Sequence, residues 1–188
     1  LISKNGYKTY LEIGVSDPAR CYFQINIEHK DGVDPFPRSL SVNYPMTSDR
    51  FFLENNKNYD IIFIDGDHRY EQVKKDLNNS LKILADNGTI VMHDCLPPTK
   101  WHQRPEWGVE KKTWNGTAWK AFAEKRILDS SLNMCVVDTD WGVGVVTKGK
   151  QRCWDQNALA ECLVYEYFEK NKKEMMNAIS IEEFLETY

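Results

Sequence analysis

Short apolar runs alternate with amphipathic stretches along the chain. The clearest run, residues 61–64 (Ile-Ile-Phe-Ile), is rich in β-branched and aromatic side chains, which suits a strand buried on both faces of a sheet. Apolar residues then recur at three- and four-residue spacing over 70–84, with charged and amide residues between them. This pattern predicts a helix, which we expect to end at residues 86–88 (Asp-Asn-Gly). Strands that alternate with helices in this way predict an α/β fold with a mainly parallel sheet.

The other predicted elements continue this alternation. We expect strands at 9–14, 29–34 and 89–92, an outer strand at 39–42, and an antiparallel hairpin of 134–138 and 141–146 joined at 139–140. We expect helices at 47–53, 117–123 and 157–179, a capped final helix from 180, and a first helix closed by Asn5-Gly6. Residues 21–27 are ambiguous, and their place between two strands favours a helix. Prolines at 35, 37 and 45 allow only short regular structure in residues 36–58.

The length of 188 residues fits one domain of ordinary size. We expect residues 1–150 to form the core, with an incomplete N-terminal helix. Residues 151–188 are expected to form a helical extension that packs on the core or on a partner subunit, which leaves a homodimer open.

Composition narrows the class of protein. The net charge of −4, without a dense Lys/Arg cluster, disfavours nucleic acid and favours a small-molecule substrate. No apolar run approaches the roughly 20 residues that span a bilayer, and the first residues do not form a signal peptide, so we expect no membrane association. The five cysteines include no CxxC pair and are odd in number, which disfavours a disulfide framework or a zinc site. We therefore expect a cytoplasmic protein with reduced thiols.

Ionisable side chains follow two of the predicted central strands. Asp65 and His68 come after the strand at 61–64, and His93 and Asp94 come after the strand at 89–92. The carboxyl ends of parallel strands meet at one edge of a sheet, where open α/β folds bind ligands. Asp65, His93 and Asp94 could therefore hold one divalent cation such as Mg²⁺. The alternative is that His93 and Asp94 only orient the substrate or cap the strand.

The first predicted strand ends in a glycine turn at Gly14, followed by a helix start, an arrangement that offers backbone N–H groups to a ligand. Glu12, inside this apolar strand, needs a partner: either a Lys or Arg, or an amine-bearing cofactor. Asp34 lies twenty residues after Gly14, the spacing at which nucleotide-binding folds place the carboxylate that holds the ribose. We favour this role over that of a turn opener before Pro35.

The glycine turn lacks the G-x-G-x-x-G series of NAD enzymes, because Ser16 and Ala19 occupy its later positions. This difference favours a nucleoside cofactor without a pyrophosphate, of which S-adenosylmethionine is the common one.

Four segments, in this order and spacing, resemble motifs of the class I S-adenosylmethionine-dependent methyltransferases: residues 10–15 (YLEIGV), 32–35 (GVDP), 63–70 (FIDGDHRY) and 88–94 (GTIVMHD). The resemblance runs from about residue 7 to about residue 147 and is greatest to the small bacterial branch that includes sugar and macrolide O-methyltransferases. It implies one Rossmann-like, doubly wound, seven-stranded sheet of order 3-2-1-4-5-7-6 with the last strand antiparallel.

The resemblance also implies roles for individual residues. The motif around Glu12 and Gly14 would contact the methionine part of the cofactor, Asp34 the ribose, and Asp65 the inner edge of the site. The cofactor-binding residues expected on this basis are Glu12, Gly14, Val15, Ser16, Asp34, Pro35, Asp65 and Gly66. Metal-dependent relatives carry acids at the positions of Asp65, His93 and Asp94, so His93 departs from their pattern.

His68 is the predicted general base, and Asp65 and Asp94 complete the predicted catalytic set. His68 would reach a substrate oxygen held by a metal at Asp65, or be steered by Asp67. Methyl transfer to a hydroxyl requires removal of a proton, and imidazole has a pKa near neutral. The resemblance adds to this interpretation, because related sugar methyltransferases use a histidine at this position. The structural alternative is a histidine at a helix N-terminus that is bonded to a backbone carbonyl.

Residues 95–116 form a long loop rich in tryptophan, which is typical of a lid or acceptor-binding loop but equally of an oligomer contact. Two functional hypotheses follow. The first is O-methylation of a small polyhydroxylated acceptor, a sugar or secondary metabolite. The second is a catalytically silent module that binds the adenosyl cofactor and partners another enzyme; a hydride-transferring reductase is a more distant third.

Overall fold

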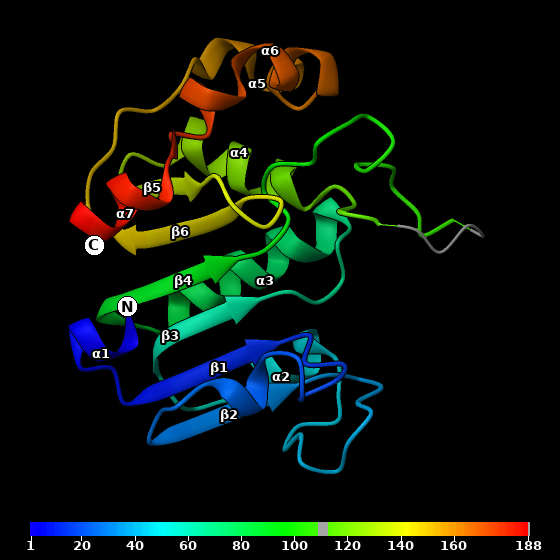
Figure 1. The fold of residues 1–188 in the computed structure, drawn as a ribbon, viewed down its shortest axis with the longest axis vertical. Helices are drawn as coiled ribbons and strands as arrows, with labels where there is room; N and C mark the ends of the chain where they lie inside the picture. Colours follow the sequence, from blue (N-terminus) through cyan, green and yellow to red (C-terminus); the bar gives the residue numbers. More distant parts are fainter. Residues whose placement is uncertain (109–112, 188) are drawn as a thin grey trace.

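The computed structural model describes residues 1–108 and 113–187, which form one seven-stranded mixed sheet with helices on both faces (Figure 1). The strands are β1 (Thr9–Ile13), β2 (His29–Val33), β3 (Tyr59–Ile64), β4 (Leu84–Met92), β5 (Leu132–Val137), β6 (Val143–Lys148) and β7 (Ala178–Ile179). Their order is β2-β1-β3-β4-β6-β5-β7, and β6 runs antiparallel to both of its neighbours. The helices are α1 (Ile2–Asn5), α2 (Ser48–Glu54), α3 (Tyr70–Ile83), α4 (Ala118–Leu128), α5 (Leu159–Cys162), α6 (Tyr165–Met175) and α7 (Ile181–Thr187), with 3₁₀ turns η1 (Tyr22–Gln24) and η2 (Gln156–Ala158).

The predicted fold class and the order of the central strands are confirmed. The prediction of an outer strand at 39–42 is wrong, because these residues form turns and only the isolated bridge between Val33 and Tyr44 extends the sheet beyond β2. Prolines before and after this segment remove backbone donors that a strand needs. The seventh strand comes instead from the C-terminal region, where β7 pairs with β5.

The main core lies on one face of the sheet. Leu11, Ile62 and Ile90 pack there against α2, α3 and α4, and Trp119 and Phe122 of α4 are fully buried. The other face carries two smaller clusters, one under α1 and η1 and one under α7. The central strands are therefore buried on both faces, which explains their uninterrupted apolar sequences.

Three predicted helix boundaries are wrong. Residues 21–27 form only the turn η1, because Tyr22, Ile25 and Ile27 all pack on the same face of the sheet, which a helix would not allow. The helix predicted to end at 86–88 stops at Ile83, since Leu84 already pairs with the sheet. The segment 157–179 breaks into η2, α5 and α6, with an extended backbone at Val164.

The helices that the sequence signals most strongly are confirmed. Helix α3 occupies almost the whole predicted range, Thr47 caps α2, and Ser180 and Glu183 form the reciprocal capping box of α7. No helix among the described residues is both long and apolar enough to cross a membrane.

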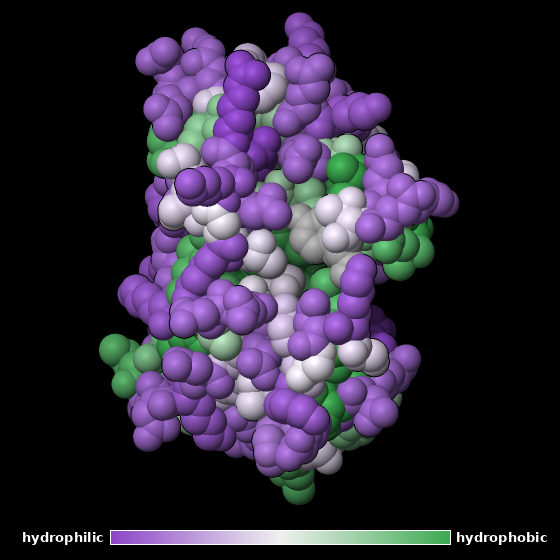
Figure 2. Space-filling model, turned by 90° about the vertical axis from the view of Figure 1, so that its left-hand side faces the viewer, coloured by the Kyte–Doolittle hydropathy of each residue, from purple (hydrophilic) through white to green (hydrophobic). Residues whose placement is uncertain are grey.

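The parallel strands β1 to β4 all end at the same edge of the sheet, on the right in Figure 1, and the loops that follow them gather there. The side of the molecule at the opposite, amino-terminal edge has a mostly hydrophilic surface (Figure 2). The carboxyl edge is therefore the place where the fold brings the predicted polar residues together.

Gly14 fixes how closely β1 and β3 approach each other at this edge. Its φ is +93°, and a Cβ atom added there would lie 2.2 Å from the backbone oxygen of Asp65. Any side chain would therefore both strain the turn and push Asp65 away.

We predict that Gly14→Ala lowers the free energy of unfolding by at least about 2 kcal/mol, because strain and backbone overlap add. The matched control is Gly6→Ala, where φ is also positive (+66°) but nothing lies within 4 Å of the added carbon. This control substitution should lower the free energy of unfolding by about 1 kcal/mol. Urea denaturation measures both values, and equal losses would contradict the steric argument.

Candidate functional site

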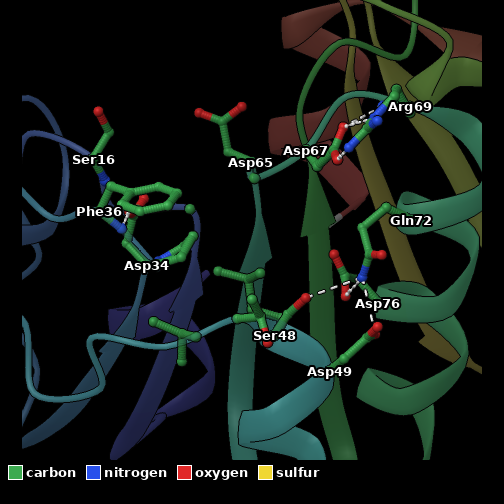
Figure 3. Close-up of a pocket in the computed structure, with 16 residues that line it drawn as sticks. Ser16, Asp34, Phe36, Ser48, Asp49, Asp65, Asp67, Arg69, Gln72 and Asp76 are labelled. Carbon is green, nitrogen blue, oxygen red and sulfur yellow. Dashed lines mark hydrogen bonds and ion pairs between the residues drawn. The ribbon is translucent and has the colours of Figure 1, made fainter.

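A cavity of about 490 Å³ opens at the carboxyl ends of β1, β2 and β3 (Figure 3). Six of the predicted cofactor-binding residues line it: Gly14, Ser16, Asp34, Pro35, Asp65 and Gly66. The remaining wall is formed by Ile13, Val33, Phe36, Thr47, Ser48, Asp49, Asp67, Arg69, Gln72 and Asp76. Ligand pockets typically measure about 300–1,000 Å³, so the space suits a nucleoside-sized molecule.

The carboxylate of Asp34 holds two backbone segments together on one side of this cavity. Its Oδ2 accepts a hydrogen bond from the backbone N–H of Ser16 at 2.9 Å, and its Oδ1 accepts one from Phe36 at 2.7 Å. Each carboxylate oxygen has a second acceptor site, so the turn-forming role and a ribose-binding role are compatible. The ribose role stays a prediction.

The glycine turn offers fewer free donors than the sequence predicted. The N–H of Gly14 donates to the Val33 carbonyl at 2.8 Å, and that of Ser16 is taken by Asp34. No α-helix starts after the turn, because residues 17–21 form bends and turns.

Glu12 does not line the cavity, and neither does Val15. The Glu12 side chain is 2 % exposed and accepts a hydrogen bond of 2.5 Å from the Tyr10 hydroxyl. Burial raises the pKa of Glu12. Its hydrogen-bond partner is thus the phenol of Tyr10, and neither a Lys or Arg nor a cofactor amine, the two partners expected from the sequence. A contact of Glu12 or Val15 with a cofactor stays a prediction.

A second polar cluster joins the ends of β3 and β4. Nδ1 of His68 lies 2.8 Å from Oδ2 of Asp94, and Nε2 of His68 lies 3.4 Å from Oδ1 of Asp65. Nδ1 of His93 lies 3.4 Å from the same Asp65 oxygen and 3.5 Å from Oδ1 of Asp94. The predicted juxtaposition of Asp65, His93, Asp94 and His68 is therefore present.

The carboxylates control the charge of both imidazoles. Burial on its own would lower the pKa of His68, but the hydrogen bonds and charges of Asp65 and Asp94 outweigh it and raise the pKa to about 9. Asp65 and Asp94 likewise outweigh the effect of burial on His93 and raise its pKa to about 11. Despite burial, the two histidines hold the pKa of Asp65 and of Asp94 below the usual value. At neutral pH the cluster thus contains two imidazolium and two carboxylate groups.

A short segment, Trp114 to Thr117, surrounds His68. The Trp114 and His68 rings stack at 4.9 Å with an interplanar angle of 4°, and the buried Asn115 amide donates to Oδ1 of Asp94. Gly116 has a φ of +62°, and a Cβ atom there would lie 2.5 Å from the His68 carbonyl oxygen, which accepts from the Thr117 N–H at 2.8 Å. Sequence analysis missed Asn115, whose only signal was an Asn-Gly pair that is typical of turns.

The β5–β6 hairpin adds one more carboxylate that sequence analysis missed. Oδ2 of Asp140 lies 3.3 Å from Nε2 of His93, and the Trp141 ring centroid lies 6.3 Å from that of His93. Asp140, Trp141 and Gly142 all have positive φ, and the carbonyls of the last two accept hydrogen bonds from backbone N–H groups just after β4. Only the tertiary fold brings this tip to His93.

One other expectation changes, and one is not tested. Asp67, considered as a partner that steers His68, instead pairs with Arg69 at 2.9 Å. In the loop 95–116, the Arg104 guanidinium stacks on Trp101 at 3.8 Å, and residues 109–112 lie outside the described residues. Whether the loop is a lid or an oligomer contact stays open.

The cluster has the composition of a cation site. Ligand atoms of Asp65, His68 and Asp94 all lie within 4.8 Å of one another, and two carboxylates with an imidazole suit a hard divalent ion. The predicted set contained His93 in place of His68. His93 lies next to the same carboxylates, and the binding of a metal stays a prediction.

We predict that His68 titrates near pH 9 in metal-free protein. Because the folded pKa lies above the unfolded value of 6.5, the stabilisation is complete below about pH 6.5 and disappears as pH rises through 9. NMR of the imidazole Cε1–H in EDTA measures the midpoint. Asp94→Asn should lower it by at least about one unit, whereas Asp67→Asn should hardly change it, and a wild-type midpoint at or below 6.5 would contradict this electrostatic account.

The fold agrees with the comparisons to known proteins. Residues 18–95 match the family model described as a methyltransferase domain. An O-methyltransferase from Bacillus cereus in complex with SAH superimposes with a TM-score of 0.55 at 13% identity, covering 78% of this chain and 77% of that chain. Cofactor-bound Rv0187 from MTB superimposes with a TM-score of 0.59 at 12% identity, covering 79% of this chain and 76% of that chain. The SAH-bound Podospora anserina methyltransferase PaMTH1 superimposes with a TM-score of 0.50 at 13% identity, covering 79% of this chain and 75% of that chain.

No curated protein matches the chain in sequence. At such low identity the structural likeness establishes the fold. The chain thus has the class I methyltransferase fold, with residues 18–95 matching the methyltransferase-domain family, as the four motifs predicted.

Proposed function

We propose that this protein transfers a methyl group from S-adenosylmethionine to an oxygen of a small polyhydroxylated acceptor, such as a sugar or a secondary metabolite. One observation carries the proposal: Asp65 belongs both to the wall of the nucleoside-sized cavity and to the cluster around His68. A cofactor in the cavity would therefore present its methyl group next to the candidate base.

The charges of the cavity support a cationic cofactor. Five carboxylates line it (Asp34, Asp49, Asp65, Asp67 and Asp76). Among the described residues of its wall, Arg69 is the only positively charged one, and it already pairs with Asp67. A negative, partly enclosed wall favours a ligand that carries a sulfonium and an ammonium group. Asp34 would accept hydrogen bonds from the ribose hydroxyls.

In the proposed reaction, the acceptor oxygen attacks the methyl carbon, the carbon–sulfur bond breaks with its electron pair on sulfur, and the hydroxyl proton moves to Nε2 of His68. This nitrogen faces Asp65, which borders the cavity, while Nδ1 is held by Asp94. The Trp114 ring and the Asn115 amide keep the imidazole and Asp94 in place. Much of the acceleration would come from this positioning.

The raised pKa of His68 conflicts with the role of a base at neutral pH. With a pKa of about 9, the imidazole already carries a proton at neutral pH and cannot accept another. A divalent cation on Asp65 and Asp94 would neutralise the carboxylates, which lowers the pKa of His68, and would also polarise the acceptor hydroxyl. We therefore include a divalent cation in the proposal.

We predict that the purified protein binds S-adenosylhomocysteine and methylates one or more members of a panel of sugar nucleotides and polyphenols with labelled S-adenosylmethionine and Mg²⁺. His68→Asn should lower kcat about 10²–10⁴-fold, because the base is lost, while cofactor affinity stays within about threefold. The control is His29→Asn, an exposed histidine at the start of β2, at the opposite edge of the sheet, which should keep full activity.

Each outcome of this experiment separates the alternatives. Absence of cofactor binding would contradict the proposed function altogether. Binding without transfer to any acceptor would favour the catalytically silent module. Transfer that survives in His68→Asn would remove His68 from the role of base.

We also predict that EDTA lowers kcat at pH 7 by at least about tenfold. The rate of the metal-free enzyme should then rise about tenfold per pH unit from 7 towards 9, as His68 loses its proton. Activity measured against pH, with and without added Mg²⁺, tests both statements. Equal rates at pH 7 in the two conditions would show that no cation is needed.

A further inference from the structure

A groove of about 410 Å³ lies between α2 and α3. Among the described residues it shares only Asp49 with the cavity of the candidate site. Its floor is apolar, because Phe52 and Ile83 are half-buried there and Leu53 is 88 % exposed. Apolar surface that is rimmed by polar residues is typical of an interaction site.

The rim of this groove is basic. Lys75 and Lys82 lie two turns apart on α3. Nζ of Lys75 is 3.4 Å from Oδ2 of Asp49, and both of these side chains are about half exposed, so the pair is worth little. Nζ of Lys82 donates to Asn79 at 2.9 Å, and within residues 1–108 and 113–187 no carboxylate lies at ion-pair distance from it. Both ammonium groups are therefore available to a negatively charged partner.

Helix α7 carries the complementary pattern on its exposed side. Ile181 and Leu185, one turn apart, are 45 % and 69 % exposed. Glu182 and Glu186 form an exposed acidic stripe next to them. The helix is about 10 Å long, which matches the about 10 Å that separate the two lysines along α3. An apolar stripe with an acidic border thus corresponds to an apolar floor with a basic border.

Within one molecule this helix and the groove are far apart. Phe184 packs α7 on β5 and β6, and the capping box of Ser180 and Glu183 fixes its first turn. Helices α2 and α3 cover the other face of the sheet. In Figure 1, α7 lies in the upper half of the molecule and α2 in the lower half. The groove is therefore open to the α7 of another molecule but not to its own.

We propose that α7 of one copy of the chain docks into the α2–α3 groove of a second copy. Ile181 and Leu185 would lie on the apolar floor, with the acidic stripe facing the two lysines, as an amphipathic helix binds in a groove. The two surfaces differ, so the contact is head-to-tail and leaves a free α7 and a free groove at the ends. This association does not depend on methyl transfer.

The size of the contact sets its strength. A helix of about two turns buries less than the roughly 1,200 Å² of a stable interface, so the association should be weak and dependent on concentration. Sedimentation velocity of the full chain should show a shift from monomer to larger species between about 10 µM and 1 mM.

Two single substitutions should each prevent the shift. Leu53→Asp puts a charge on the floor of the groove, and Leu185→Asp puts one on the apolar stripe of α7, so either variant should stay monomeric up to about 1 mM. Both leucines are exposed, so both variants should fold, which circular dichroism checks. The matched control is Leu40→Asp, at a fully exposed leucine outside both surfaces, which should associate as wild type does.

A mixture of the two variants separates this contact from its alternatives. The Leu53→Asp chain keeps an intact α7 and the Leu185→Asp chain keeps an intact groove, so together they should form a dimer of one copy of each and nothing larger. Contact of α7 with α7 would leave Leu53→Asp associated, and contact of groove with groove would leave Leu185→Asp associated.

Charge reversal tests the basic rim. A chain with Glu182→Lys and Glu186→Lys, and a chain with Lys75→Glu and Lys82→Glu, should each be monomeric, because like charges then face each other. Their mixture should associate again, since every α7 then meets a groove of opposite charge. A wild type that stays monomeric at about 1 mM, single leucine variants that associate as wild type does, or mixtures that stay monomeric would each overturn the proposal.

Discussion

The close packing of Gly14 against the backbone of Asp65 is the constraint on which the site depends. A single added carbon at Gly14 would overlap the Asp65 carbonyl, so the carboxyl ends of β1 and β3 approach as closely as two backbones can. This contact places Asp65 at the boundary between two regions. On one side is the cavity that Asp34 organises, and on the other are the two histidines.

The histidine region is a balanced cluster of charges. Asp65 and Asp94 come from neighbouring parallel strands, and each is close enough to both imidazoles to keep them protonated. Asp94 has a φ of +62°, a conformation that turns its carboxylate inward, and the buried Asn115 amide holds it there. The two imidazole protons supply the positive charge that the carboxylates require, and the divalent cation of the proposed function would supply the same charge in their place.

The segments that complete the site come from distant parts of the chain. Trp114 and Asn115 belong to the loop after β4, and Asp140 belongs to the hairpin between β5 and β6. The hairpin reaches His93 because β6 inserts antiparallel next to β4. The antiparallel strand that distinguishes this sheet is therefore also what closes the site on that side.

The amino-acid sequence alone predicts the α/β class, the central strands, the long helix α3 and the meeting of Asp65, His68, His93 and Asp94. The reason is that buried parallel strands and amphipathic helices leave strong local patterns, and parallel strands must end at one edge. The sequence motifs also indicated the fold family.

Other features emerge only in the folded protein. The tertiary structure replaced the outer strand at 39–42 by β7, reduced the helix at 21–27 to a single turn, and gave Glu12 a phenol as its partner. It also brought Asn115 and Asp140 to the histidines. The pairing of β7 with β5 and the contacts of Asn115 and Asp140 join residues far apart in the chain. Such contacts leave no periodic signal in the sequence, because any polar residue at the right place in space can make them.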